Sequence, residues 1–433
     1  MLRRSILGAS ALAAVPRVAF AANPDVAIVG AGVAGIAAAR ALKAAGKSVI
    51  VIEARDRIGG RAFTDTSLGF AFDHGAQWIE AGTTNPAMAI LREMGAKPQS
   101  DRERQMIYIG GKELSKDDYA RLEKITGEAS RKLAEILKKL PDVPVGRILV
   151  PQDRLEQLAY AMVGPLEAGV ETAELSALDF TRQPDAEPQF AVPGGLGAMI
   201  ARWGAKVPVK LGTKVVRIDS TGAEVAIETI AGQVRAKAAV VTVPTGVLAA
   251  GAIGFAPQLS AAKKEAISGL PMSVYNKVAL TFTRRVIDAP AGANATALTK
   301  ADLAFDSVLR PQGQEAAICF SGGAHGRQLE EQGSSAAVAF ALSALAEIYG
   351  NDLRGALAKS VVTRWGHDLF ARGSWSTARP GHADKRTVLA LPHHDRVFFA
   401  GEATDPVWAA RIGGAYLSGL RAAKEALGVL SRN

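Results

Sequence analysis

The chain has 433 residues, of which 48% are hydrophobic, and it carries 51 Lys and Arg against 42 Asp and Glu. A chain of this length can bury a large core, and we expect two domains. The basic residues form no long block and aromatic residues are only 6%, which favours a basic solvated surface over nucleic-acid binding. The single cysteine, Cys319, can form no intramolecular disulfide and is predicted to pack in the core.

Residues 1–22 have the features of an export signal rather than of a folded segment. Arg3 and Arg4 precede a mildly apolar stretch over residues 5–15, and residues 19–21 form a small-x-small cleavage pattern. The apolar stretch is too short to span a bilayer, so no stable membrane anchor is expected. We expect export by the twin-arginine route to the periplasm; the alternative is an uncleaved N-terminus that frays.

The next segment predicts a strand, a glycine-rich turn and a helix. Apolar residues Val26 to Val29 lead into the pattern G-x-G-x-x-G, and an alanine-rich helix is predicted over Ile36 to Ala45. The three glycines are Gly30, Gly32 and Gly35. Glycine permits a tight turn, close approach to a pyrophosphate and helix–strand packing, and the helix N-terminus favours phosphate. This pattern predicts dinucleotide binding.

Glu53 ends a second predicted strand, Ser48 to Ile52, and lies 23 residues beyond Gly30. A carboxylate at this position can accept both hydroxyls of an adenosine ribose, and it argues against a 2′-phosphate. The order of strand, turn, helix, strand and acid strengthens the prediction of a dinucleotide. It does not distinguish NAD from FAD.

Further motifs follow in a fixed order, and together they extend from about residue 26 to residue 426. They are residues 53–61, 72–79, 193–196, 240–244, 275–278, 364–368, 372–376, 401–402 and 413–419. In this order they resemble the FAD-dependent amine oxidase family, in the branch of the monoamine and polyamine oxidases. The resemblance covers nearly the whole mature chain.

The resemblance implies an α/β (α+β) fold, in which an FAD-binding Rossmann-like domain is joined to a discontinuous substrate domain of mixed sheet plus helices. The cofactor signatures lie at both ends and in the middle of the chain. We therefore assign residues 24–80, 190–270 and 360–433 to the FAD-binding domain. Residues 81–189 and 271–359 are assigned to the substrate-binding domain.

Periodicity predicts several elements within these segments. They are an amphipathic helix at 118–140, a β-meander at 209–229 with a turn at 220–222, strands at 238–243, 277–282 and 316–320, and a helix at 335–349. The apolar stripe of the first helix is interpreted as core; a membrane-surface role is the alternative.

The resemblance also assigns cofactor contacts along the chain. Beside the three glycines and Glu53, the residues expected to bind FAD are Arg55, Gly60, Arg61, Gly75, Ala76, Gln77, Trp78, Val215, Trp365, Gly401, Glu402 and Ile412. Glu402 is expected to hold the ribityl chain, and Trp365 either packs along the flavin or belongs to the core. The FAD is expected to be non-covalent, because no cysteine stands near residues 374–377.

Lys277 is the candidate catalytic residue, since it matches the family's lysine that holds a water against flavin N5. The alternative is an ordinary strand lysine at the surface. Substrate selection departs from the family, whose paired aromatic residues correspond here to Thr377 and Arg411. Trp375 and Trp408 lie near these positions and could replace them. An arginine in the cavity would favour a substrate with a carboxylate, unless it contacts FAD or forms a salt bridge.

We therefore expect FAD-dependent oxidation of a small primary or secondary amine to an imine, which water then hydrolyses, with oxygen or a redox carrier receiving the electrons. An amino acid is included among these substrates. The alternatives are a flavin-dependent desaturase or amino-acid oxidase of the same superfamily, and a non-catalytic FAD-bound scaffold. No metal motif and no nucleic-acid partner are indicated, and a homodimer is left open.

Overall fold

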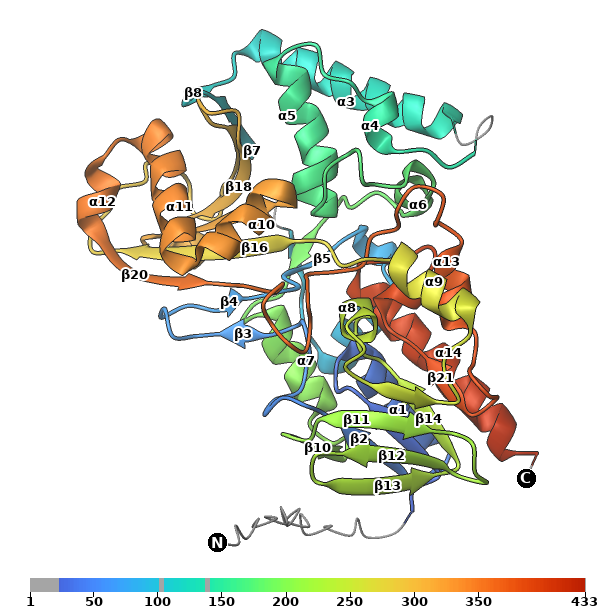
Figure 1. The fold of residues 1–433 in the computed structure, drawn as a ribbon. Coiled ribbons are helices and arrows are strands. Elements are labelled where there is room, and N and C mark those ends of the chain that lie inside the picture. The colour runs from blue at the N-terminus through green and yellow to red at the C-terminus, as the bar shows by residue number, and fades with distance from the viewer. Residues whose placement is uncertain (1–22, 101–104, 137–140, 433) are drawn as a thin grey trace, which may run out of the picture.

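The computed structural model describes residues 23–100, 105–136 and 141–432. Its two halves are built on a five-stranded and a seven-stranded sheet (Figure 1). The predicted export signal, residues 1–22, lies outside the described residues, as does the end of the predicted 118–140 helix.

The five-stranded sheet is parallel throughout and joins segments from both ends of the chain. Its strands in order are β10 (Val209–Lys210), β2 (Val49–Ile52), β1 (Val26–Val29), β14 (Ala238–Val241) and β21 (Val397–Phe399). One face packs against α1 (Val33–Ala44), α7 (Leu196–Gly204) and α14 (Ile412–Leu430). Successive side chains of β1 are buried on alternate faces, which explains its unbroken apolar run. The predicted α/β unit is confirmed.

A four-stranded sheet covers the opposite face of the parallel sheet. Its strands in order are β13 (Gly232–Ala236), β12 (Val225–Thr229), β11 (Val215–Asp219) and β15 (Gly254–Ala256). The predicted turn at 220–222 joins β11 to β12. The predicted meander was wrong at its start, because Val209 and Lys210 pair with β2 instead. Gly212, with a φ of 61°, follows that strand and separates it from the meander.

The seven-stranded sheet is mixed, with one parallel pair, β17 with β7. Its strands in order are β20 (Leu357–Val362), β16 (Tyr275–Phe282), β19 (Ala316–Gly322), β18 (Ala304–Leu309), β17 (Asn294–Leu298), β7 (Gln105–Ile109) and β8 (Lys112–Glu113). Cys319 and Leu280 lie on the face shared with the core of α10 (Gly323–Gln332), α11 (Ser334–Tyr349) and α12 (Asp352–Ala356). Phe320 lies on the other face, which packs against Phe70 and Phe72 of the first half.

A helical layer lies beside the β7 end of this sheet (Figure 1). It contains α3 (Lys116–Ile136), α4 (Val145–Ile148), α5 (Arg154–Val163), the π-helical segment η2 (Gly164–Ala168) and α6 (Ala177–Arg182). The stripe of α3, including Leu122, Ile125 and Leu133, is buried against α5 and its neighbours, so it belongs to the core. No helix among the described residues is long and apolar enough to cross a membrane.

The remaining elements are short and lie outside the three larger sheets and the helical layer. They are β3 (Thr64–Asp65), β4 (Phe72–Asp73), β5 (Trp78–Ile79), β6 (Gln99–Ser100), β9 (Phe190–Ala191), η1 (Gly82–Thr84), α2 (Met88–Met94), α8 (Thr245–Ala249), α9 (Ala261–Gly269), η3 (Pro311–Gly313), α13 (Lys385–Ala390) and η4 (Glu402–Thr404). The buried carboxylate of Asp73 accepts the N–H groups of Leu196 and Gly197 at 2.9 and 3.0 Å. These bonds fix the start of α7 beside Asp73, whose backbone carbonyl accepts a hydrogen bond from Lys277.

Candidate active site

One cavity of about 810 Å³ extends from the glycine-rich turn to the face of the seven-stranded sheet that carries Phe320. The residues predicted from sequence that line it are Gly30, Gly32, Glu53, Arg55, Gly60, Arg61, Gly75, Ala76, Gln77, Trp78, Val215, Lys277, Trp365, Trp375, Gly401, Glu402, Arg411 and Ile412. Three of the predicted residues are not on its wall, namely Gly35, Thr377 and Trp408.

The glycines of the turn are required by close contacts. Gly30 has a φ of 104°, and a Cβ there would lie 2.5 Å from Oγ1 of Thr242. A Cβ on Gly35 would lie 2.0 Å from the carbonyl oxygen of Gly30, so this glycine packs α1 onto the turn instead of lining the cavity. Gly32 immediately precedes α1 and offers no side-chain cap, which leaves the first N–H groups of the helix available to a phosphate.

The Glu53 carboxylate is buried and held by two backbone donors. It accepts the N–H of Ala31 at 2.7 Å and that of Arg55 at 2.8 Å. Each carboxylate oxygen keeps acceptor capacity toward the cavity, as binding of two ribose hydroxyls requires. Val215, at the start of β11, lines the same end of the cavity. These groups fit the adenosine part of a dinucleotide.

Arg55 and Trp365 are held in place by neighbouring polar groups. Arg55 forms a bidentate ion pair with Asp368, with N–O distances of 2.7 and 2.8 Å. The backbone N–H of Trp365 donates to Oδ1 of Asn276, and its indole N–H donates to the carbonyl of His74. The Asn276 side chain therefore fixes Trp365 on the cavity wall.

Arg61 and Glu402 meet on the wall, at 3.0 Å between Nη1 and Oε1. Glu402 also accepts the Ser376 hydroxyl at 2.7 Å, its N–H at 3.1 Å, and the N–H of Ala410 at 3.0 Å. Burial raises the pKa of Glu402, but the positive charges of Arg61 and Arg386 outweigh burial and hold the pKa below its usual value. Glu402 is therefore an oriented anion.

Lys277 is buried on β16, and its amine donates to three protein oxygens. Nζ lies 2.8 Å from the carbonyl of Asp73, 2.9 Å from that of Gly75 and 2.7 Å from Oε1 of Gln77. Burial lowers the pKa of Lys277 to about 7, although the charge of Asp73 opposes this shift. The surface-lysine alternative is excluded by this burial.

Aromatic rings surround the amine. Nζ of Lys277 lies 5.3 Å from the ring centre of Phe320 and 5.6 Å from that of Trp78. Tyr275, on the same face of β16, lies 5.2 Å from Trp375, ring centre to ring centre. Trp375 in turn donates its indole N–H to the carbonyl of Ala168.

Trp375, rather than Thr377, provides the aromatic wall after Gly373. Thr377 donates its N–H to the carbonyl of Pro271 and is buried away from the cavity. Trp375 lines the cavity, whereas the hydrogen bond to Pro271 holds Thr377 outside its wall. Trp408 lies outside the cavity wall, where its N–H donates to Oδ1 of Asp405.

Arg411 is buried among acidic groups of the cavity. Its Nε lies 2.5 Å from Oε2 of Glu80 and its Nη2 lies 3.8 Å from Oε1 of Glu167. Its Nη1 donates to the carbonyl of Pro184 at 2.7 Å. Burial and the neighbouring charge of Glu80 raise the pKa of Glu167 to about 7, against the effect of Arg411. Arg411 therefore forms a salt bridge, which was one of its predicted alternatives.

Asp306 on β18 contributes another carboxylate to the cavity wall. Burial raises the pKa of Asp306 to about 6, although a hydrogen bond from Thr296 opposes the shift. No cation among the described residues forms an ion pair with it within 4.0 Å. Its charge is therefore available to a ligand.

The cavity residues that sequence reasoning missed include Glu80, Glu167, Tyr275 and Asp306. Tyr275 could have been found, because it lies two residues before Lys277 and so shares its face of the strand. Glu80 and Glu167 carry no periodic signal, since they precede a short helix and end a π-helical segment. Within the described residues, no group of three or more His, Cys, Asp or Glu could hold a metal ion.

Comparison with known proteins identifies the family of this chain. The sequence pattern of the flavin-containing amine oxidoreductases matches residues 33–144 and 128–427. Polyamine oxidase 2 of Arabidopsis thaliana is 29% identical over 93% of this chain and 88% of its own length. A lysine-specific histone demethylase 1 homolog of Oryza sativa is 30% identical over 92% of this chain, which spans 52% of that relative.

Among solved structures, wild-type putrescine oxidase bound to putrescine is similar in fold, with a TM-score of 0.80 and 19% identity. The match covers 94% of this chain and 99% of that one. The family pattern spans most of the sequence, and the fold agrees with it. The protein therefore belongs to the flavin-containing amine oxidoreductase family and is a flavin-dependent enzyme that oxidises amines.

Proposed function

We propose that this enzyme holds FAD non-covalently and oxidises a small amine that carries a second positive charge, such as a diamine or polyamine. The observation that carries the proposal is that three carboxylates, those of Glu80, Glu167 and Asp306, line the cavity that contains Lys277. Carboxylates beside a buried amine favour a cationic ligand, because its charge compensates their own. The polyamine oxidases and putrescine oxidase among its relatives support the same substrate class.

The identity of the cofactor as FAD is supported by Glu53 and the glycine-rich turn. A carboxylate with two oxygens open toward the cavity suits an unphosphorylated ribose, and the start of α1 suits a pyrophosphate. Non-covalent attachment is supported by the position of Cys319. This single cysteine is buried on β19 and is not on the cavity wall, so its thiol is not placed to bond a flavin in the cavity.

A bound flavin would supply the acceptor for a hydride equivalent from the carbon that bears the substrate nitrogen, and water would hydrolyse the resulting imine. The protein contributes orientation and exclusion of water. The rings of Tyr275, Phe320 and Trp375 form an apolar surface, and the carboxylates hold the charged end of the substrate. The reacting amine must be neutral, and an apolar surface favours its neutral form. The acidic groups bind the second, charged amine at the other end of the substrate.

We propose that Lys277 acts at the reacting end of the substrate. Its pKa of about 7 leaves a large fraction of the amine neutral near physiological pH. Three protein oxygens already accept from Nζ. A neutral amine has only two N–H bonds, so on deprotonation one of these oxygens loses its donor and a lone pair becomes available to a water.

Arg411 makes amino acids poor candidates for the substrate. Its charge is balanced by Glu80 and Glu167 before any ligand enters. A substrate carboxylate would have to replace Glu80 and would then lie beside unpaired acidic groups. The balanced charge of Arg411 therefore favours a diamine over an amino acid, although both would be substrates of the same flavin chemistry.

Anaerobic bleaching of the flavin tests the proposal. The purified enzyme is mixed without oxygen with 1,4-diaminobutane, spermidine, butylamine or a neutral amino acid, and flavin absorbance is followed. We expect the diamine and spermidine to bleach the flavin at concentrations at which butylamine and the amino acid do not. Preference for the amino acid would contradict the substrate class, and no bleaching by any amine would favour the scaffold alternative. Re-exposure to oxygen then tests whether oxygen is the acceptor.

We also propose that the enzyme is exported to the periplasm as a folded holoprotein. Arg3 and Arg4 support this route, because an arginine pair is the signal that the twin-arginine translocon recognises. Replacing both with lysine should retain active enzyme in the cytoplasm, as measured by fractionation. Periplasmic activity of that variant would contradict the route.

A further inference from the structure

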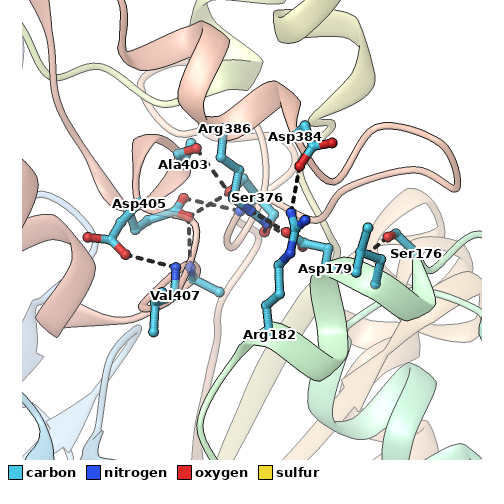
Figure 2. A network of polar contacts seen from close by, with 12 residues as sticks. Ser176, Asp179, Arg182, Ser376, Asp384, Arg386, Ala403, Asp405 and Val407 are labelled. Carbon is cyan, nitrogen blue, oxygen red and sulfur yellow. Dashed lines mark hydrogen bonds and ion pairs between the residues drawn. The ribbon is translucent and has the colours of Figure 1, made fainter. Parts of the chain in front are cut away.

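Asp179 and Arg386 form an ion pair that lies behind the cavity wall, inside the protein. Arg386 is 0% exposed and Asp179 is 1% exposed. The pair is bidentate, with Nε to Oδ1 at 2.6 Å and Nη2 to Oδ2 at 2.7 Å (Figure 2). Burying two charges costs free energy that their attraction alone does not always return.

The remaining donors of Arg386 lead to the cavity. Its Nη1 donates to the Ser376 hydroxyl at 2.8 Å, and that hydroxyl donates its own proton to Oε2 of Glu402 at 2.7 Å. Glu402 lines the cavity and meets Arg61 there. Asp179, Arg386, Glu402 and Arg61 thus form a row of alternating charge, in which a serine hydroxyl joins the inner pair to the outer pair.

The row connects the cofactor side to the substrate side of the cavity. Asp179 lies on α6, and the segment that follows this helix carries Gln183 and Glu187 on the cavity wall. Arg411 holds the same segment by donating to the carbonyl of Pro184. The ion pair therefore links the segment after α6, on the substrate side, to Glu402 on the cofactor side.

We propose that Arg386 is a positioning residue for the cofactor, because through Ser376 it fixes the Glu402 carboxylate as an oriented anion against the flavin nucleotide. The inference rests on the proposed binding of FAD. Ser376 can accept from Arg386 and donate to Glu402 at once, and this order of donors determines which oxygen of Glu402 is engaged.

A paired substitution separates positioning from stability. Arg386→Met alone would leave Asp179 buried without a partner and is expected to unfold the protein. Asp179→Leu together with Arg386→Met removes both charges, a change that is often neutral for stability when the volume is kept. This double variant should melt, as apoprotein, near the wild-type temperature and yet release FAD about tenfold faster on dilution, because Glu402 loses a charge-assisted network.

The flavin midpoint potential gives a readout that a purely structural role would not change. The double variant removes a cation that contacts Ser376 and an anion that lies behind that cation, so the net change makes the electrostatic potential at Glu402 more negative. Added electrons on the flavin are then less favourable, so the midpoint potential of the double variant should shift to a more negative value. Ser376→Ala keeps the ion pair and removes only the bridging hydroxyl, and it should change FAD release and the potential in the same directions by smaller amounts.

Arg182 provides the matched control. It lies on the same helix as Asp179 and pairs with Asp384, whose side chain is 80% exposed (Figure 2). Arg182→Met should leave FAD release and the midpoint potential at wild-type values. The inference is overturned if the double variant or Ser376→Ala retains both wild-type values. Failure of the wild-type protein to bind FAD would instead contradict the proposed function.

Discussion

Lys277 and Asp306 lie in one row across the seven-stranded sheet, each directly opposite Phe320 on the strand between them. Residues paired in this way share a face, and neighbouring strands are about 4.8 Å apart, so the two backbones are about 10 Å apart. Phe320 therefore stands between the two residues in this row, and its ring centre lies 5.3 Å from Nζ of Lys277. A diamine oxidised beside Lys277 can therefore extend over the ring and place its second ammonium at Asp306.

Replacing Asp306 with asparagine should raise KM for 1,4-diaminobutane by about 10- to 100-fold, because a hydrogen bond to a charged group contributes about 1.5–3 kcal/mol. The KM for butylamine should not change, since it has no second charge. Steady-state turnover with both substrates measures this difference. Asp288→Asn is the control, because Asp288 pairs with Arg285 at the surface and is 98% exposed. An equal rise for both amines would place Asp306 outside the substrate site.

The same interaction predicts how diamine affinity depends on pH. Burial raises the pKa of Asp306 to about 6, so its carboxyl becomes protonated as the pH falls through that value. The substrate ammonium stays charged over this range, and KM for the diamine should therefore rise toward acid pH. Asp306→Asn should remove the part of the profile near pH 6. The variant should keep the part of the profile that is due to Glu167, because burial raises the pKa of Glu167 to about 7.

Lys277→Met should leave FAD bound, because the groups that fit the nucleotide lie elsewhere and methionine has similar bulk. Turnover should fall by about 100-fold, which is typical for loss of a proton-transferring side chain. Stopped-flow spectroscopy of flavin reduction by the amine, and of reoxidation by oxygen, shows which half-reaction slows. Lys359→Met is the control, since Lys359 is an exposed lysine on the neighbouring strand β20. Normal rates in both half-reactions would remove Lys277 from the mechanism.

The cofactor side of the cavity was predictable because its residues serve the backbone geometry of one motif. Gly30 has a positive φ and Gly35 packs closely against the turn. Both positions require glycine, so both constraints are visible in the sequence. Glu53 follows a buried strand at a fixed distance. Local patterns of this kind can be recognised without knowledge of the tertiary structure.

The substrate side was less predictable, because its residues converge from unrelated elements. Glu80, Glu167 and Asp306 come from a loop, a π-helical segment and a strand, and no sequence spacing links them. The position of Trp375 depended on the register of an irregular segment, where an error of two residues selected Thr377. Arg411 was placed correctly on the wall, but its partners could be identified only from the structure.

Arg411→Gln tests whether this residue limits the negative charge offered to the substrate. In the wild type its guanidinium pairs with Glu80 and lies 3.8 Å from Glu167. Without it both carboxylates can bind the substrate cation, so KM for diamines should fall by about fivefold, the factor that corresponds to 1 kcal/mol for a partly exposed ion pair. The measurement is made above the pKa of Glu167, about 7, where its carboxylate is charged.

The opposite role of Arg411 predicts a different result. If it bound a substrate carboxylate, Arg411→Gln would abolish oxidation of amino acids and leave diamines unchanged. Arg411→Lys keeps the positive charge and should keep the wild-type KM, which separates the effect of charge from that of shape. Thermal unfolding of both variants controls for lost packing, because the buried side chain also holds the carbonyl of Pro184. A lower diamine KM in Arg411→Gln alone would therefore identify Arg411 as the internal counterion that competes with the substrate.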